Sequence, residues 1–277
     1  MTADCHMHMI LDGYDWKSAI QRHAQGPEDG FIRQVLSTYQ QLGITYLRDG
    51  GDRWGASKRA RQLAPDYGIT YRTPLAPLCC KGHYGSFIGL AYEDLRQYAR
   101  LVAQQRQAGA DFIKIMISGL MDFDHYGVLT EPGLDPKQIR QLIHIAHEEG
   151  MAVMAHANGA DTILAAAEAG VDSVEHGAYQ NAESLAALTQ AGTVWVPTLS
   201  TVGSLLGKGR FPDLQVGKIL EDTLEKLSCY QGLVAPGTDA GAWAVPHGSD
   251  TEQALLARAG VDNARLQAGI AAIQQTF

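Results

Sequence analysis

Short runs of apolar residues alternate with longer amphipathic segments along the whole chain. The runs have the length and the β-branched content of buried strands, and segments with helical periodicity follow them. Eight runs are predicted to be strands: 3–8, 44–48, 69–76, 112–118, 151–156, 173–176, 193–199 and 233–238. The alternation predicts repeated strand–helix units and a parallel sheet.

The helical segments end at glycines, and an apolar strand soon follows each of these glycines. Clear examples are 31–42 before Gly43, 93–108 before Gly109, 136–149 before Gly150, and 181–191 before Gly192. Eight such units in 277 residues match a closed (β/α)8 TIM barrel of the α/β class better than an open, doubly wound sheet. An open sheet more often has a glycine-rich phosphate loop after its first strand, and none follows 3–8. We therefore expect one barrel domain over residues 1–277.

The longest connections all come after strands. They are 9–30, 77–91, 119–135, 200–213 and 240–250. In a barrel these loops gather at the C-terminal face, where active sites are built, whereas the opposite face has short turns. This asymmetry favours an enzyme.

Composition and charge exclude several classes of partner. Lys and Arg number 22 against 30 Asp and Glu, which gives a net charge of −8, so we expect neither nucleic acid nor anionic membrane as a partner. The four cysteines, Cys5, Cys79, Cys80 and Cys229, match no zinc-binding spacing and indicate a reducing compartment. The first residues lack the features of a secretory signal, so the expected location is cytoplasmic.

Residues that can bind a metal lie at the ends of five of the eight predicted strands. They are His6, His8, Lys114, His156, His176 and Asp239. Two residues apart on a strand, His6 and His8 share one face at a spacing of about 7 Å, close enough to share an ion. Taken singly, each histidine also fits a surface or hydrogen-bonded core position, and Asp239 also fits a helix cap.

Lys114 interrupts the apolar run 112–117, which is typical of a barrel wall. Lysine is rarely buried without a partner. Its side chain could instead extend to solvent at the strand end or pair with a structural carboxylate. Burial also lowers the pKa of a lysine, and the neutral amine can react with carbon dioxide to give a carbamate, an anionic ligand able to bridge two cations.

The ordered set resembles the amidohydrolase superfamily in its binuclear, carboxylated-lysine form. The set consists of His6-x-His8, Lys114, His156, His176 and Gly237-Thr238-Asp239. The stretches around Lys114, His156-Ala-Asn-Gly159, Glu175-His-Gly-Ala-Tyr179 and Pro246-His247-Gly248 further resemble its imidazolonepropionase-like and prolidase-like branch. The resemblance covers nearly the whole chain.

The resemblance implies two divalent metal ions. His6, His8 and Asp239 would hold one, His156 and His176 the other, and carboxylated Lys114 would bridge them. Zinc is the default metal, and manganese, cobalt or iron would also suit these ligands. A metal-bridging hydroxide would attack the substrate, and Asp239 would move its proton to the leaving amine.

Several further residues are expected near the substrate. The resemblance makes Tyr179 a catalytic donor to the developing oxyanion. His83 and Tyr84, in the loop after the third strand, and His247, after the eighth strand, are weaker candidates for substrate contacts. Arg48 and Asp49 are predicted to form a structural pair beneath the site.

The expected reaction is hydrolysis of an amide bond in a small molecule, such as a dipeptide or an N-acyl amino acid, in the manner of prolidases. Two alternatives from the same superfamily remain: hydrolysis of a cyclic amide or lactone, and deamination. A catalytically silent, ligand-binding barrel is the alternative from another class. Superfamily members usually carry a β-sandwich beside the barrel; this sequence is expected to lack it, and helices of a second copy could cover the edges in a homo-oligomer.

Overall fold

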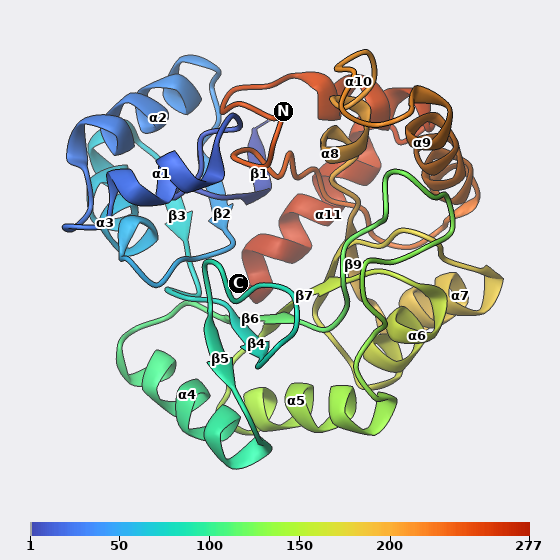
Figure 1. Cartoon of the computed structure of the whole chain (residues 1–277), viewed down its shortest axis with the longest axis horizontal. Coiled ribbons are helices and arrows are strands. Elements are labelled where there is room, and N and C mark those ends of the chain that lie inside the picture. The colour runs from blue at the N-terminus through green and yellow to red at the C-terminus, as the bar shows by residue number, and fades with distance from the viewer. Residues whose placement is uncertain (1) are drawn as a thin grey trace.

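Parallel strands form the centre of the molecule and helices surround them (Figure 1). The computed structural model describes residues 2–277. The strands are β1 (Ala3–Met7), β2 (Tyr46–Asp49), β3 (Thr70–Arg72), β4 (Leu78–Cys80), β5 (Leu90–Tyr92), β6 (Ile113–Met116), β7 (Val153–Ala157), β8 (Ser173–His176) and β9 (Val194–Val196). The helices are α1 (Trp16–Arg22), α2 (Asp29–Gln41), α3 (Ala56–Leu63), η1 (Ala64–Tyr67), α4 (Leu95–Gln107), α5 (Pro136–Glu148), α6 (Ala160–Glu168), α7 (Ala182–Ala191), α8 (Ser200–Gly203), α9 (Asp213–Cys229), α10 (Thr251–Arg258) and α11 (Asn263–Thr276).

Two parallel sheets together form a barrel. One has the order β1-β2-β3 and the other the order β5-β4-β6-β7-β8-β9. Residues 233–240 run between them, because Val234 bridges to Trp195 of β9 and Ala240 bridges to Met7 of β1. The predicted (β/α)8 barrel is thereby confirmed.

The third predicted strand, 69–76, is interrupted rather than continuous. Only its residues 70–72 form a strand, β3, which pairs with β2. The connection predicted over 77–91 is wrong in part, because β4 begins at Leu78 and pairs with β6 and with β5, and β5 lies at the end of the same stretch. Pro74 has no N–H to donate, and Leu75 adopts a positive φ of 64°, so regular pairing stops between β3 and β4.

The eighth predicted strand, 233–238, makes bridges and single hydrogen bonds instead of a regular ladder. Pro236 cannot donate to a neighbouring strand, although its carbonyl accepts from the Cys5 N–H at 2.8 Å. The next residue must be glycine, because a Cβ on Gly237 would lie 2.5 Å from a Val196 methyl carbon. This irregular segment carries Thr238 and Asp239 to the C-terminal face.

The helices agree with the predicted ranges to within about two residues, because their end signals are local. The Asp94 side chain accepts the Gln97 N–H at the start of α4, and Asn181 forms a capping box with Ser184 at the start of α7. Within residues 2–277, no helix is both long and apolar enough to cross a membrane.

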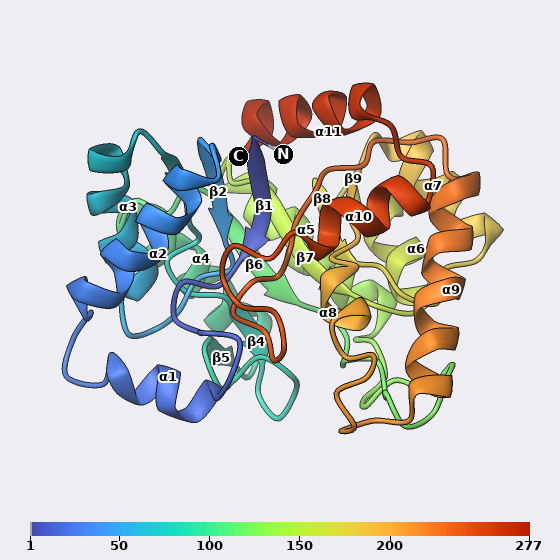
Figure 2. The ribbon, with the colours of Figure 1, turned by 90° about the horizontal axis from the view of Figure 1, so that it is seen from above.

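Helix α11 lies across the same end of the barrel as the N-terminus (Figure 2). Its apolar residues Ile270, Ile273 and Phe277 pack on the apolar cluster inside the barrel. The close approach depends on Gly269, where a Cβ would lie only 2.0 Å from the Val234 carbonyl oxygen. The N-terminal end of the barrel is therefore closed by packed side chains.

Replacing Gly269 by alanine should destabilise the fold. Relieving the contact with the Val234 carbonyl requires α11 to move away from the barrel, at a cost of about 2 kcal/mol in free energy of unfolding. Gly217→Ala in α9 is the matched control, since a Cβ there meets nothing within 4 Å, and it should stabilise by up to about 1 kcal/mol. Urea denaturation measures both variants; equal effects would contradict the packing described.

A buried carboxyl group joins α10 to the start of α8. Glu252 has 0 % exposure, and its Oε2 accepts from the Ser200 N–H at 2.7 Å and hydroxyl at 3.0 Å. Its Oε1 has no partner in the described part of the chain. Burial raises the pKa of Glu252 to about 8.

This raised pKa predicts a pH-dependent difference between wild type and Glu252→Gln. Between pH 4.5 and about 8 the unfolded chain loses the Glu252 proton while the folded protein keeps it, so the wild type loses stability with rising pH over this window. The variant lacks this loss. The contributions of all other titratable groups to the free energy of unfolding cancel when the two proteins are compared at the same pH. Denaturation at pH 5, 6.5 and 8 should show the variant gaining steadily on the wild type; a constant difference would contradict the assignment.

Candidate metal centre

Side chains from strand ends all around the barrel converge on one cavity at its C-terminal face. The cavity has a volume of about 640 Å³. Its lining includes all six residues predicted as metal ligands: His6, His8, Lys114, His156, His176 and Asp239. Each of them is at most 8 % exposed. The barrel therefore brings together residues that are more than two hundred positions apart in the sequence.

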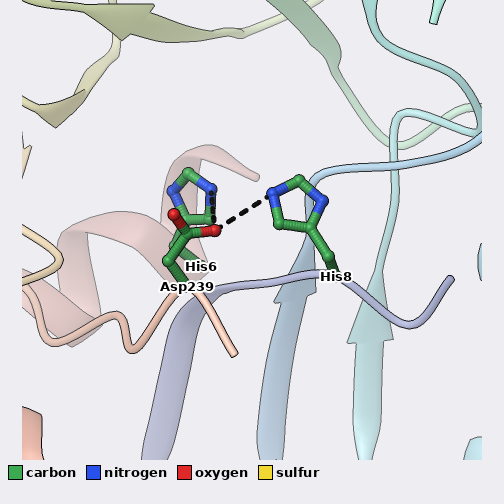
Figure 3. Close-up of side chains that lie close together, drawn as sticks. All are labelled: His6, His8 and Asp239. Atoms are coloured by element: carbon green, nitrogen blue, oxygen red, sulfur yellow. Dashed lines mark ion pairs between the residues drawn. The ribbon is translucent and has the colours of Figure 1, made fainter. Parts of the chain in front are cut away.

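His6, His8 and Asp239 form the tightest group (Figure 3). Asp239 Oδ1 lies 3.1 Å from His8 Nε2 and 3.4 Å from His6 Nε2. Yet His6 Nε2 and Asp239 Oδ1 make no hydrogen bond with any residue in 2–277. Buried polar atoms without hydrogen bonds are costly, and two nitrogens gathered around a carboxylate oxygen suit a divalent cation.

A second pair of imidazoles adjoins this group. The ring centres of His156 and His176 are 4.5 Å apart, and His176 lies 5.1 Å from His6. Burial lowers the pKa of His156 to about 3 and lowers the pKa values of His6 and His176 well below the usual range. These rings are neutral at pH 7, which is the form that binds metal.

In each of these three rings one nitrogen makes a hydrogen bond to the protein, and the other is available to bind a metal ion. His6 Nδ1 donates to Glu175 Oε2 at 2.6 Å, and His156 Nε2 donates to the Gly119 carbonyl at 3.1 Å. His176 Nδ1 lies 2.7 Å from Thr198 Oγ1. Metal-binding histidines are commonly oriented in this way by a second partner. The residues present therefore fit a metal centre.

Lys114 lies on β6 with 1 % exposure, and its Nζ has no hydrogen-bond partner among residues 2–277. Burial lowers its pKa to about 8, against the opposing charges of Glu175 and Asp239. A substantial neutral fraction near physiological pH is what reaction with carbon dioxide requires.

A buried ion pair beneath the site was missed by the sequence analysis. Glu175 Oε1 accepts from Arg48 Nη2 at 2.8 Å and from Ser173 Oγ at 2.6 Å, while its other oxygen orients His6. Arg48 and Glu175 are both 0 % exposed.

The predicted pairing of Arg48 with Asp49 is wrong. Asp49 accepts from the Met9 N–H and the Tyr71 hydroxyl instead, because adjacent strand residues point in opposite directions.

Three residues at or near the site have a strained backbone. His176, Thr198 and Asp239 have φ values of 67°, 47° and 54°. Non-glycine residues rarely adopt such angles, and they persist only where the surroundings enforce them. Of these three residues, His176 and Asp239 line the cavity, and Thr198 bonds to the His176 ring.

A second buried carboxylate supports the segment that carries Asp239. Asp4 accepts from the Thr238 N–H at 2.9 Å and the Thr238 hydroxyl at 2.6 Å, and Tyr39 Oη lies 3.3 Å away. Burial raises the pKa of Asp4 to about 6. His247 lies behind Tyr39, 3.3 Å from its hydroxyl, and is bonded to the Leu11 carbonyl at 2.9 Å.

The remaining predicted residues are divided between cavity and periphery. Tyr84 lines the cavity, with its ring centre 4.8 Å from that of His156. His83 pairs with Glu131 at 2.9 Å, and Tyr179 packs against Tyr126 at 5.7 Å. Neither of them lines the cavity, nor does His247. The structure thus places Tyr84 at the site and leaves the expected roles of the other three without support.

The cavity also has an aromatic mouth that was not predicted. We define it by its rings, which come from five different connections of the chain: Tyr14, Trp16, Tyr84, Phe87, Phe123, Phe211 and Trp243. The loops were predicted to lie at this face, but which of their side chains turn inward depends on loop conformation. The mouth is suited to apolar and aromatic groups.

Comparison with known proteins relates this arrangement to a family. Residues 31–207 match the model of the amidohydrolase family. Ochratoxinase from Aspergillus niger is 27 % identical over 186 residues, which are 64 % of this chain and 36 % of the fungal protein. The matched region thus spans little more than a third of that relative's length.

Solved structures with the same fold cover nearly the whole chain. A crystal structure of an Xaa-Pro dipeptidase with bound methionine has a TM-score of 0.72 and 21 % identity, covering 99 % of this chain and 72 % of its own. That of A. niger ochratoxinase has a TM-score of 0.76 and 21 % identity, covering 95 % and 68 %. At this identity the likeness concerns the fold.

Removing the carboxylate charge beneath the site should be costly. Glu175→Gln leaves the Arg48 guanidinium buried without a counter-charge and should lower the free energy of unfolding by about 3 kcal/mol. The control is Glu168→Gln, whose partner Arg140 lies 3.1 Å away in an exposed pair and which should change stability by less than about 0.5 kcal/mol. Chemical denaturation compares the two; similar small losses would show that Arg48 does not depend on Glu175.

Proposed function

This chain belongs to the amidohydrolase family, and we propose that it is a metal-dependent hydrolase that cleaves an amide bond in a small molecule. The observation that carries the proposal is the convergence of six metal-binding side chains on one cavity, with buried polar atoms left unbonded. The cavity volume of about 640 Å³ suits a molecule of dipeptide size or somewhat larger.

The donor set divides naturally between two divalent ions. His6, His8 and Asp239 would hold one ion, and His156 and His176 the second. Lys114 would lie between them after its neutral amine attacks the carbon of carbon dioxide and loses a proton, giving a carbamate. Zinc, manganese, cobalt or iron would suit these nitrogen and oxygen ligands. When bound, such ions polarise a carbonyl group and lower the pKa of water towards 7.

Asp239 is the proposed proton carrier. Burial alone would raise its pKa, but His6 and His8 outweigh that effect and hold the pKa of Asp239 below its usual value. The ionised carboxylate can accept a proton from the attacking water. As the carbon–nitrogen bond breaks, the same proton passes to the leaving amine.

Tyr84 is the proposed substrate contact where the aromatic mouth meets the proposed metal ligands. Its ring lies beside His156, and burial raises the pKa of its hydroxyl, so that it stays protonated and able to donate. Tyr179, the oxyanion donor expected from the resemblance, lies outside the cavity lining. Tyr14 and Tyr84 both line the cavity, and the ring of Tyr84 lies beside the proposed metal ligand His156.

The substrate class we favour is a dipeptide or an N-acyl amino acid. One of the similar proteins named above supports this choice, because it is a dipeptidase by name. Lys114 favours two-metal hydrolysis over deamination, because superfamily deaminases usually lack the bridging lysine.

Metal content and turnover should respond differently to Asp239→Asn. The purified wild type should hold about two equivalents of metal and hydrolyse members of a panel of dipeptides and N-acyl amino acids. The variant should retain most of the metal and lose activity by about a thousandfold, as expected for loss of a general acid–base group. Elemental analysis and amine-release assays provide the two measurements.

Asp161→Asn is the matched control, because Asp161 is exposed on α6 and should change neither quantity. Equal turnover in wild type and Asp239→Asn would remove Asp239 from its proposed role. A wild type without metal after growth with zinc or manganese would favour the catalytically silent barrel.

A further inference from the structure

One arginine lies at the aromatic mouth of the cavity. Arg210, in the loop between α8 and α9, lines the cavity and is exposed. Its guanidinium carbon lies 4.5 Å from the ring centre of Trp243 and 5.2 Å from that of Phe211. The two rings thus hold the guanidinium group in place.

The donors of this guanidinium are unused by the protein. Arg210 makes no hydrogen bond to a side chain and no ion pair within the part of the chain that the structure describes. Most other arginines pair with a carboxylate, as Arg22 does with Asp12 at 3.0 Å and Arg61 with Asp111 at 3.0 Å. A guanidinium stacked on aromatic rings has a fixed plane, and its free N–H groups lie in that plane. Such a group is well suited to bind a carboxylate through two parallel hydrogen bonds.

Arg210 is the positively charged side chain at the mouth of the cavity that can bind an anionic group. The other Lys or Arg in the lining is Lys114, which is buried at the floor beside the proposed metal ligands. Asp122 and Asp124 also line the cavity and repel anions, although Asp122 is paired with His125 at 2.9 Å. A carboxylate on a substrate is therefore stabilised at Arg210 and disfavoured at Asp122 and Asp124, whose loop adjoins that of Arg210 through the rings of Phe123 and Phe211, 5.2 Å apart.

We propose that Arg210 binds the free α-carboxylate of the substrate, while the adjoining rings Phe123, Phe211 and Trp243 hold its apolar side chain. The substrate class is then an N-acyl amino acid or dipeptide whose C-terminal residue is large and apolar or aromatic. This inference rests on the proposed amide hydrolysis, and it names the part of the substrate that the mouth recognises.

The kinetic experiment compares acid and amide substrates in Arg210→Gln. N-acetyl-L-phenylalanine carries the carboxylate, and N-acetyl-L-phenylalaninamide lacks its charge. The variant should raise KM for the acid about tenfold, equivalent to about 1.4 kcal/mol, with little change in kcat and none for the amide. Arg53→Gln is the matched control: Arg53 also stacks on a tryptophan, Trp54, at 4.5 Å, but lies outside the cavity lining.

A binding experiment provides a readout that does not depend on turnover. The probe is 2-benzyl-4-oxopentanoate, in which a methylene replaces the amide nitrogen of N-acetylphenylalanine, together with its carboxamide. Titration of the purified protein should change tryptophan emission through Trp243, with a Kd about tenfold weaker in Arg210→Gln and unchanged in Arg53→Gln. The emission change should be smaller in Trp243→Phe, since Trp16 is then the remaining tryptophan in the cavity lining.

The two proposals fail in different ways. If no amide is hydrolysed but the acid probe binds through Arg210, the proposed function is overturned and the carboxylate site stands. If amides are hydrolysed, yet acid and amide forms have equal KM and Kd in wild type and Arg210→Gln, the carboxylate site is overturned and the proposed function stands.

Discussion

The site depends on one charge that the fold buries completely. The Arg48 guanidinium lies inside the barrel without access to water, and the energetic cost of such a charge is offset only by a partner of opposite charge in good geometry. Glu175 supplies that partner, and its second oxygen fixes the ring of His6. The ion pair thus couples the stability of the barrel to the orientation of His6 in the proposed metal centre. The ring of Phe277, which follows α11, packs over the same guanidinium at 4.4 Å. The end of the barrel opposite the cavity therefore also contacts the buried ion pair.

Much of the fold could be predicted because its signals are local. Apolar runs identified the strands, and capping residues such as Asp94 and Asn181 identified helix starts. The failures occur where backbone chemistry overrides the apolar pattern. Around Pro74 and Pro236 the sequence is as apolar as a strand, but the missing N–H groups and the close approach at Gly237 prevent a regular ladder.

The site could be predicted only in part, for a related reason. Strand ends meet at one face of a barrel, so the position of His156 or Asp239 in the sequence is enough to bring it to the cavity. The hydrogen-bond partners of the site residues cannot be predicted from strand ends. Glu175 and His6 are 169 positions apart, and no spacing rule connects them. Loop residues are harder still. His83 and Tyr84 are adjacent, yet one pairs with Glu131 and the other turns towards His156, a choice made by loop packing.

The closed end of the barrel determines the route by which a molecule reaches the cavity and leaves it. Packed side chains and α11 fill the interior below the metal centre, so whatever reaches the cavity must enter and leave through the aromatic mouth. Both cleavage products would have to diffuse out by the route that the next molecule uses to enter. Under the proposed hydrolysis, an amino-acid product that keeps the carboxylate proposed to bind Arg210 would compete directly with fresh substrate, and competitive product inhibition would follow.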